Sequence, residues 1–522
     1  MNYFKNVAKI ISIGCFLLSS VSLFAQRNAQ YDNNWLLAIG DSALSVNFTN
    51  GYPEVNKVDL ITEFEMTSTF MSNKDGDLQF YSNGCAIFNK NHVIMHNGRK
   101  LNAGSVADDY CIDPQFGEIG FYPGSSRTLL SIPKPYSDRE YFVLHRPLYR
   151  DTTDTYPNWV RNRSFITTIN MEENNGLGRV MELRKEYSTR YFESGFTMNK
   201  HANGEDWWVI DPLLESDSIA VFLLDSNGMN IAHVFNIGLT DDNSTRGFEQ
   251  AIFSPDGSLF IRHNGNIGTR IFDFNRSTGE LSNFRHLPLP PDDPQTAYTW
   301  GYGGVAVSPN GRFLYVSNWS RVFQYDLDAS DVLQSRMLIA DLEYRNDHRL
   351  EDVTTTVRMQ LGPDCKIYIF AHAGNDIHVI HNPNEKGAAC DWEEDGLALP
   401  HSVSRDQPYF PVFRIGTAKD PVSPCVDYSS VATEEQYLPV KTYVTISPNP
   451  SSGPVQLKLR EGISALNLSW ALYDAGGRRV QSVELNHRKQ LTIPRQNLPA
   501  GLYYWELGSS SGTLDRGKLV FH

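Results

Sequence analysis

The stretch QAIFSPDGSLFIRHNGNIGTRIFDFNRSTGELSNFRHLPL, residues 250–289, contains one complete unit of a repeated pattern. Apolar runs at 251–253, 259–262 and 269–274 are interrupted by turn residues at 255–257, and a second turn follows at 277–279. Glycine after Asp or Asn supplies the left-handed backbone that a tight hairpin needs. We therefore interpret 250–289 as four short antiparallel strands.

The unit recurs along the chain. Its first hairpin returns as VAVSPNGRFLYVSN (305–318) and MQLGPDCKIYIFA (359–371), and Pro255, Pro309 and Pro363 are 54 residues apart. With the weaker copies that precede them, the equivalent turn positions are Gly76, Arg139, Gly204, Gly257, Gly311 and Cys365. Repeats of this length, built from short strands and turns, are typical of β-propellers. The sequence predicts an all-β propeller with six full repeats.

The two ends of this region indicate how the ring closes. Tyr409–Ile415 (YFPVFRI) has the pattern of an inner strand that no repeat follows, whereas Trp35–Gly40 and Leu44–Phe48 are strands that no repeat precedes. Joining these strands in one blade would remove an exposed sheet edge. We therefore expect a seven-bladed propeller over residues 26–416. The alternative is six blades, with 409–415 simply ending the sixth.

A smaller unit follows the propeller. Residues 417–441 lose the periodicity and gather Pro, Ser, Thr and Glu, which indicates a linker. Residues 442–522 alternate apolar and polar side chains, with turn residues at 476–477 and 509–512. This pattern predicts a small C-terminal β-sandwich.

The smaller unit resembles the C-terminal sorting domain of cargo of the type IX secretion system of Gram-negative bacteria. The resemblance is carried by Pro448, Asn449, Pro450, Gly453, the run Leu472–Gly476, Gly501, Tyr503, Gly517, Lys518, Leu519 and Val520. It implies an outer-membrane translocon as partner, and a cargo that is secreted or attached to the outer cell surface. The runs SPDGSLFI, SPNGRFLYVSN and GPDCKIYIF are similar to those of WD-repeat-like and lactonase-type propellers, which is a resemblance of fold alone.

The start of the chain and its charge bear on its location and partners. Residues 1–25 hold Lys5 and Lys9, an apolar run and small residues before Gln26, which is the pattern of a secretory signal peptide. No other apolar run reaches the roughly 18 residues that a transmembrane helix needs. The formal net charge is −14, and residues 26–439 alone carry about −21. This charge argues against a nucleic-acid partner, because phosphate contacts require surplus cations.

An exported chain can form disulfides. Outside the predicted signal peptide there are five cysteines, at positions 85, 111, 365, 390 and 425. We favour the pairs Cys85–Cys111 and Cys390–Cys425, because each joins neighbours across a loop-rich interval. Cys365 is then left as a buried free thiol. Spacing alone leaves the connectivity open.

The chain lacks the usual local signatures of catalysis. No nucleophile elbow, zinc-binding helix, phosphate-binding glycine loop or EF-hand spacing occurs. His378 and His381 fall on one predicted strand, where residues three apart point to opposite faces. We therefore expect ordinary histidines of a blade rather than a metal site, and we expect no cofactor.

Aromatic and basic residues at one end of the predicted strands are the candidates for ligand binding. Positions just before an inner strand face the rim or the central channel of a propeller. There, aromatic faces can stack on sugar rings and guanidinium groups can provide polar contacts. The candidates are Trp300, Tyr302, Trp319, Arg262, Arg321 and Arg358. The alternative interpretation is that the aromatics pack between blades.

Three functions follow from these patterns. The first is a surface-attached or secreted propeller that binds a glycan or a protein through loops at one end of the ring. The second is a lactonase-like or glycan-cleaving hydrolase with a site in the channel, and the third is a structural component of a surface assembly for adhesion or motility. Because no catalytic signature occurs, we expect binding rather than catalysis.

Overall fold

The computed structural model describes most of the chain in segments. The described residues are 29–39, 42–62, 64, 67–111, 120–123, 128–151, 158–192, 195–214, 216–237, 250–289, 303–318, 320–342, 356–371, 376–401, 408–417, 422–425, 444–459, 468–474, 478–485, 488–509 and 512–522. The predicted signal peptide at 1–25 lies outside them. Within the described part, no helix has both the length and the apolar character needed to cross a bilayer.

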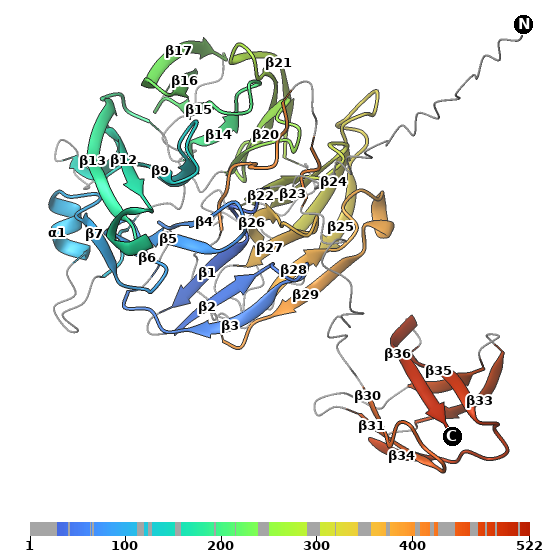
Figure 1. Cartoon of the computed structure of the whole chain (residues 1–522). Coiled ribbons are helices and arrows are strands. Elements are labelled where there is room, and N and C mark those ends of the chain that lie inside the picture. The colour runs from blue at the N-terminus through green and yellow to red at the C-terminus, as the bar shows by residue number, and fades with distance from the viewer. Residues whose placement is uncertain are drawn as a thin grey trace, which may run out of the picture. The chain divides into compact units, whose positions relative to one another are not determined.

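The chain divides into two compact units, residues 1–431 and 432–522. Strands dominate both units, and the helices of the described residues are short (Figure 1). These are α1 (Ser105–Tyr110), α2 (Glu173–Gly176) and the 3-10 helix η3 (Gly387–Cys390). The chain is therefore an all-β protein, as predicted.

Consecutive strands of the larger unit build one three-stranded group and six four-stranded antiparallel groups, each of which we call a sheet. The second and third of these are joined into one eight-stranded sheet, because β13 pairs with β7 in parallel through Arg179 and His96. The first sheet is β1 (Asn34–Ile39), β2 (Ser42–Asn47) and β3 (Glu54–Val58). The second is β4 (Thr69–Ser72), β5 (Leu78–Ser82), β6 (Ala86–Asn89) and β7 (Ile94–Arg99). The third is β8 (Leu129–Pro133), β9 (Glu140–His145), β12 (Ser164–Asn170) and β13 (Arg179–Ser188). A small hairpin, β10 (Tyr149–Asp151) and β11 (Asn158–Val160), is inserted in the third.

The remaining sheets of the larger unit follow the same plan. The fourth is β14 (Thr197–Lys200), β15 (Trp207–Pro212), β16 (Ser218–Asp225) and β17 (Gly228–Asn236). The fifth is β18 (Gln250–Phe253), β19 (Leu259–Asn264), β20 (Gly268–Asn275) and β21 (Glu280–Leu287). The sixth is β22 (Gly303–Val307), β23 (Phe313–Asn318), β24 (Arg321–Asp326) and β25 (Met337–Asp341). The seventh is β26 (Thr356–Leu361), β27 (Ile367–Ala371), β28 (Asp376–Ile380) and β29 (Trp392–Ala398).

The sheets stand around a common centre (Figure 1). First strands of successive sheets are in contact, in the pairs β1–β4, β4–β8, β14–β18, β18–β22 and β22–β26. The first sheet also meets the last, because the Trp35 ring of β1 packs 5.2 Å from the Tyr368 ring of β27. A ring of radially placed, four-stranded sheets is the arrangement of a β-propeller. The count of seven blades stays a prediction, because the first sheet has three strands.

A buried glutamine shows how tightly the first strands are joined. Gln250 of β18 accepts hydrogen bonds from the backbone N–H groups of Val305 (3.1 Å) and Met359 (3.2 Å), and donates one to the carbonyl of Met359 (2.6 Å). One side chain therefore links the first strands of the fifth, sixth and seventh sheets. Buried amide groups that are satisfied in this way hold their neighbours in a specific register.

The centre of the ring is occupied by residues 408–417, which we call the central segment. The Tyr409 hydroxyl donates to the carbonyls of Phe196 (3.0 Å) and Ala251 (2.6 Å), and the Phe410 ring lies 6.2 Å from that of Phe70. Further along, Phe413 packs 6.0 Å from Trp207. These partners belong to different sheets around the ring. A residual cavity of about 40 Å³ remains between residues 410–412 and β14, β18, β22 and β26.

The prediction that 409–415 forms an inner strand is wrong. No strand is assigned to 408–417, and its polar groups bond instead to side chains and carbonyls of several sheets. The apolar pattern YFPVFRI arises because the segment is buried on all sides, and a fully buried segment has the same apolar run as an inner strand. Pro411 also lacks the N–H group that a strand ladder requires.

Both disulfides of the described residues involve the larger unit. Cys85 and Cys111 are bonded, as predicted, but the second bond joins Cys365 to Cys425. The predicted pair Cys390–Cys425 is therefore wrong, and Cys390 is the buried free thiol. The central segment carries the chain through the ring, so that Cys425 meets the turn between β26 and β27. Cys390 is closer to Cys425 in sequence than Cys365 is, but sequence separation did not predict which thiol lies near Cys425 in the fold.

The smaller unit is a two-layer β-sandwich. Its sheets are β30 (Val444–Ser447), β31 (Val455–Leu459) and β34 (Gln490–Ile493), against β33 (Arg479–Glu484), β32 (Ser469–Tyr473), β35 (Gly501–Ser509) and β36 (Gly512–Phe521). The alternation read from the sequence is visible in β31, where Val455, Leu457 and Leu459 are buried and the residues between them are exposed. These side chains pack around Trp470 in a core of their own.

Candidate functional site

The ring has two distinct ends. In a four-stranded meander, the turns between first and second strands and between third and fourth strands lie at the same end. We call this end the turn face and the opposite one the loop face. The central segment runs from the loop face, near Ala251, to the turn face, where Arg276 of the turn after β20 donates to the carbonyl of Gly416 at 2.8 Å.

The predicted site residues that the structure describes lie toward the loop face. Arg262, near the end of β19, and Arg358, in β26, are both buried. At the start of β22, the backbone of Arg358 lies against Gly304, where an added Cβ would meet it, and the ring of His263, the residue after Arg262, lies against Gly303. Arg321 begins β24 and pairs with Asp341 at 3.1 Å. Trp300, Tyr302 and Trp319 lie outside the described residues, so the aromatic part of this predicted site stays a prediction.

Sequence reasoning did not single out Arg270 at this end. It lies directly opposite Arg262 in the β19–β20 register and is equally buried. A charged residue inside the apolar run TRIFDF (269–274) was the signal that could have identified it.

The turn face carries a pocket that the sequence did not predict. Two adjoining hollows, of about 280 and 650 Å³, share Lys134, Tyr136, Ser137 and Asp138. We call them together the turn-face pocket. Its principal side chains are Tyr31, Tyr136, Asp138, Lys200, Glu205 and Trp207. They come from the segment before β1, from the β8–β9 turn and from the β14–β15 hairpin, so that separate repeats supply them.

Tyr136 projects from this turn in an unusual backbone conformation. The N–H of Ser137 donates to the carbonyl of Lys134 at 3.2 Å, which places Pro135 and Tyr136 at the two central positions of the turn. Tyr136 has φ 59°, a left-handed conformation that such a position normally reserves for glycine. Its side chain is nevertheless 62% exposed. The left-handed residue of this turn is thus Tyr136. The repeat pattern had predicted Arg139 as the turn position equivalent to the glycines of the other repeats.

Carboxylates determine the electrostatics around the two tyrosines. Burial and the negative charges of Asp138, Glu205 and Asp75 raise the pKa of Tyr31 to about 12. Desolvation and the carboxylates of the β14–β15 and β16–β17 turns also raise the pKa of Tyr136. Both phenols therefore remain neutral hydrogen-bond donors at physiological pH.

The basic side chains of the pocket are already engaged. Lys134 pairs with Glu140 at 2.7 Å, and Arg139 pairs with Glu172 at 2.6 Å. Lys200 lies 5.5 Å from the centre of the Trp207 ring, and its burial lowers the pKa of its ammonium group. The basic side chains that line the pocket therefore do not give it a net positive charge.

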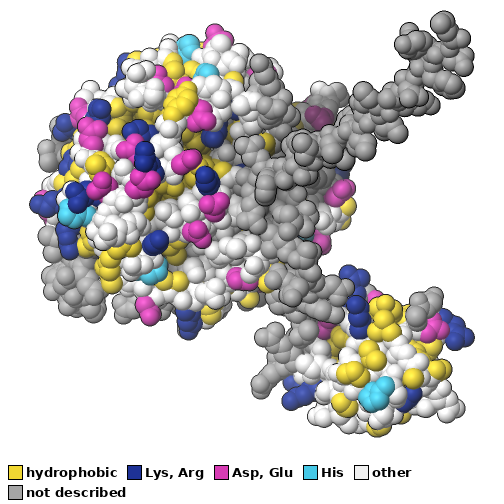
Figure 2. All heavy atoms as spheres, in the orientation of Figure 1, with side chains coloured by type: hydrophobic (Ala, Val, Ile, Leu, Met, Phe, Trp, Pro, Cys, Tyr) yellow, Lys and Arg dark blue, Asp and Glu magenta, His cyan; other side chains and the backbone are white. Residues whose placement is uncertain are grey.

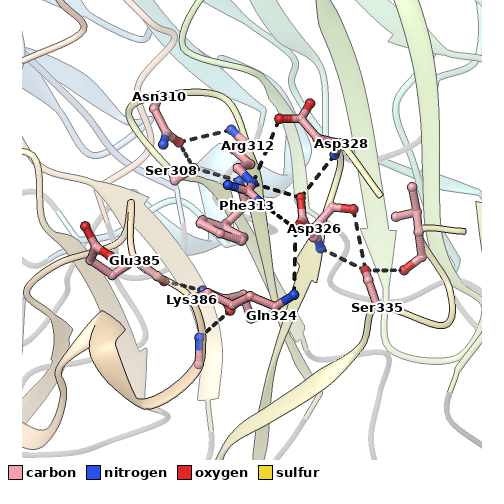
Figure 3. A network of polar contacts seen from close by, with 12 residues as sticks. Ser308, Asn310, Arg312, Phe313, Gln324, Asp326, Asp328, Ser335, Glu385 and Lys386 are labelled. Carbon is pink, nitrogen blue, oxygen red and sulfur yellow. Dashed lines mark hydrogen bonds and ion pairs between the residues drawn. The ribbon is translucent and has the colours of Figure 1, made fainter. Parts of the chain in front are cut away.

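A second polar cluster on the turn face is saturated by its own contacts (Figure 3). Arg312 donates to both oxygens of Asp326, at 3.0 and 2.8 Å, and these hydrogen bonds hold the pKa of Asp326 below its usual range. Gln324 donates to the carbonyl of Glu385 at 2.7 Å and accepts from the N–H of Gly387 at 2.8 Å. The cluster ties the sixth sheet to the seventh, which is a structural role.

The histidines of the seventh sheet also have structural contacts. His378 is buried, and its Nδ1 accepts a hydrogen bond from the Asp395 N–H at 3.0 Å. His381 pairs with Glu393 at 2.8 Å. Among the described residues, no three His, Cys, Asp or Glu side chains are placed to hold one metal ion. On the visible face of the larger unit, acidic and basic side chains are interspersed (Figure 2).

The sorting-motif residues of the smaller unit form contacts that stabilise its strands and turns. Asn449 donates to the carbonyl of Lys518 at 2.7 Å and accepts from the N–H of Val520 at 2.9 Å, so that the Pro448–Pro450 run is fixed to β36. The Tyr503 hydroxyl donates to the carbonyl of Pro499 at 2.9 Å. At Gly517, an added side chain would meet Trp505 at 2.6 Å, so the close approach requires glycine.

Several solved structures resemble the chain at low sequence identity. A protein from Lactobacillus plantarum has 12% identity, covers 71% of this chain and 97% of its own, and gives a TM-score of 0.41. A putative 6-phosphogluconolactonase from Bacteroides fragilis has 12% identity, covers 72% of this chain and 97% of its own, and gives a TM-score of 0.37. The β-propeller domain of Cps50 (Swd1) from Myceliophteria thermophila has 9% identity, covers 66% of this chain and 92% of its own, and gives a TM-score of 0.36. No curated protein matches the chain in sequence.

The smaller unit has a clear family match. Residues 445–521 match the secretion system C-terminal sorting domain, and this match covers the motif residues placed above. The domain directs export through type IX secretion. The chain therefore carries a C-terminal sorting domain of type IX secretion, and it is exported to the cell surface or secreted.

Proposed function

We propose that this exported chain is a binding protein, whose ligand is a glycan or a protein held on an end face of the ring. One observation carries the proposal: residues 408–417 fill the centre of the ring, whereas a polar pocket with an exposed tyrosine is open on the turn face. Trp300, Tyr302 and Trp319, which the sequence predicts at the rim or the channel, would add a second contact surface. Nothing in the described residues favours the lactonase-like alternative, since the axis where its site was expected holds the chain itself.

Binding of purified full-length chain to glycan arrays and to arrays of envelope and host proteins tests this function. We expect the chain to bind at least one array ligand saturably, and we expect this binding to be lost in one of two variants. Tyr136→Gly alters the turn face, and Arg321→Gln alters the loop face. If neither array gives saturable binding, the proposal fails. Loss of binding in only one variant identifies the face that is used.

The same arrays address the third alternative, a structural component of a surface assembly. Such a component would bind other proteins of the outer surface and no soluble glycan. Deletion of the gene, followed by a measurement of cell attachment to surfaces, separates an assembly role from ligand capture.

A further inference from the structure

We propose that the type IX translocon binds the outer face of one sheet of the smaller unit, the sheet of order β33-β32-β35-β36. This sheet is one layer of the sandwich, and its inner face covers the core around Trp470 (Figure 1). The inference concerns the surface by which the sorting domain is recognised. It goes beyond the proposed function, and it does not depend on the ligand of the ring.

The alternation along the last two strands decides which side chains face outward. In β36, Leu519 is buried in the core, so its neighbours Lys518 and Val520 point to the other side of the sheet. Leu502 and Tyr504 of β35 likewise alternate with buried residues, and they are 39% and 43% exposed. Both strands therefore present apolar or aromatic side chains on the outer face.

The register of the sheet brings these side chains together. Tyr504 lies directly opposite Tyr473 of β32 on one side and directly opposite Lys518 on the other. Two residues along, Leu502 lies opposite Val520. Residues that pair in this way have their Cβ atoms about 4.5–5.5 Å apart, so the five side chains form one continuous surface. We call these five residues the tyrosine face.

Folding explains other residues of the sorting motif. Leu472 and Leu519 lie in the core, and Gly517 leaves room for the ring of Trp505. Asp474 accepts a hydrogen bond from the backbone N–H of Arg478 at 3.0 Å, and so joins β32 to β33. These motif residues are needed for the sandwich itself, whatever partner it meets.

The motif residues of the tyrosine face have no such role. Among the described residues, the side chains of Tyr473, Lys518 and Val520 form no hydrogen bond or ion pair, and Tyr473 and Val520 are not packed against the core. All three nevertheless belong to the stretch that matches the sorting domain, residues 445–521. Contact with the component that recognises this domain accounts for side chains that folding does not require.

The opposite sheet shows what an ordinary solvent-exposed face of the same unit looks like. The exposed side chains of β30, β31 and β34 are all polar: Thr445, Ser447, Gln456, Lys458, Gln490 and Thr492. The tyrosine face differs, since four of its five residues are aromatic or aliphatic. Apolar and aromatic side chains gathered on one side of a small domain mark an interaction surface. The two outer faces of the sandwich are therefore not equivalent.

The composition of the tyrosine face fits a protein partner. Tyrosine contributes apolar area together with a hydroxyl group, and it loses little conformational entropy on binding. The face therefore suits a surface that is mainly apolar, with carbonyl or carboxylate oxygens placed to accept from two phenols and from the ammonium group of Lys518. A single ammonium group beside four uncharged side chains is a poor match for an anionic lipid surface, which attracts clusters of basic residues.

Site-specific photo-crosslinking of the full-length chain in the producing bacterium tests the inference. Benzoylphenylalanine is placed at position 504 in the tyrosine face or, as the control, at position 458 on the polar face. After irradiation, the adducts are identified by mass spectrometry. We expect position 504 to crosslink to an outer-membrane component of type IX secretion, and position 458 to give no adduct above background. No such adduct from position 504, or equal adducts from both positions, would overturn the inference.

Export of substituted chains is the second measurement. Leu502→Ser/Tyr504→Ser should accumulate in the periplasm, whereas the control Gln456→Ser/Lys458→Ser should be exported as the parent is. Circular dichroism and thermal unfolding of the purified chains check that the sandwich is retained. If the first variant does not fold, Lys518→Glu replaces an exposed side chain of the same face and should also reduce export. Normal export of folded variants of the tyrosine face would contradict the proposal.

Discussion

Arg414 and Asp32, which are 382 residues apart in the chain, form a buried ion pair on the turn face, with Arg414 Nη2 donating to Asp32 Oδ2 at 2.6 Å. The Arg414 Nε group also donates to the carbonyl of Pro424 at 2.6 Å, and its Nη1 to the carbonyl of Ala29 at 3.3 Å. One guanidinium group therefore joins the N-terminal segment, the central segment and the residues before Cys425.

Replacing Arg414 with methionine should destabilise the ring strongly. Removal of one partner leaves a buried carboxylate without its counter-charge, which typically costs about 3–5 kcal/mol. Denaturant unfolding, followed by tryptophan fluorescence, measures the change. Arg139→Met, which breaks an exposed ion pair with Glu172, is the control and should show no measurable change. Equal midpoints for the two variants would contradict the assignment.

The disulfide pattern predicts one free thiol in the mature chain. If the signal peptide is removed with Cys15, alkylation of the denatured, non-reduced protein should label Cys390 alone. Peptide mass spectrometry identifies the labelled residue. Labelling of Cys365 instead would restore the pairing expected from sequence.

Loss of the second disulfide should destabilise the ring. Cys365 and Cys425 are 60 residues apart, and closing a loop of that length contributes roughly 4 kcal/mol in the chain-entropy description. Cys425→Ser should therefore lower the Tm of the ring. Cys390→Ser breaks no covalent link and keeps a polar group beside Tyr315, so it should change the Tm much less. Calorimetry of both variants under non-reducing conditions makes the comparison.

Tyr136→Gly should separate stability from binding. Glycine adopts φ 59° without strain, so the Tm should stay the same or rise, while binding of an array ligand held on the turn face is lost. Thermal unfolding and calorimetric titration are measured on the same preparation. A clear fall in Tm would show that the tyrosine ring is needed for folding.

Stability should decline at alkaline pH through Tyr31. Its folded-state pKa is raised to about 12, so the folded form keeps a proton that the unfolded form loses near pH 10. The stabilising contribution is therefore complete below pH 10 and is lost as pH rises from 10 toward 12. Tyr31→Phe should show a smaller decline over this range. Unfolding midpoints at pH 8, 10 and 11 measure the difference, and parallel curves would contradict the prediction.

Stability should also decline at acid pH through His145. Burial lowers its pKa to about 3, and its ring nitrogens contact Asn102 (2.8 Å) and Thr167 (2.9 Å). Because the unfolded form binds a proton from about pH 6.5 downward, the contribution is complete above that value and is lost as pH falls toward 3. His145→Gln, which retains polar contacts without titrating, should flatten this slope between pH 6.5 and 4.

Local chemistry explains what the sequence predicted well. The turns at Gly76, Gly204, Gly257 and Gly311 are left-handed, because a hairpin needs that conformation whatever surrounds it. The alternation of the smaller unit likewise follows from burial of one face of each sheet. Short-range patterns of this kind can be recognised without knowing the rest of the fold.

The course of the central segment, the second disulfide and the turn-face pocket could not be predicted, because they depend on contacts between distant repeats. Tyr409 bonds to carbonyls 213 and 158 residues earlier, and no periodicity encodes such a partner. The Cys365–Cys425 bond depends on the same passage through the ring. The turn-face pocket was missed because its residues come from the segment before β1, the β8–β9 turn and the β14–β15 hairpin, which are far apart in the sequence. Tyr136 also lies at a turn position where the repeat pattern predicts no special residue.

The central segment has a consequence for the order in which the larger unit is completed. Its residues, 408–417, are synthesised after every sheet of the ring, yet Phe410 and Phe413 cover aromatic rings of β4 and β15 that would otherwise face water. A nascent chain that has reached only β29 thus has all its sheets and an uncovered apolar axis. The larger unit can therefore acquire its native interior only after residues 408–417 have been synthesised, shortly before the sorting domain that follows them.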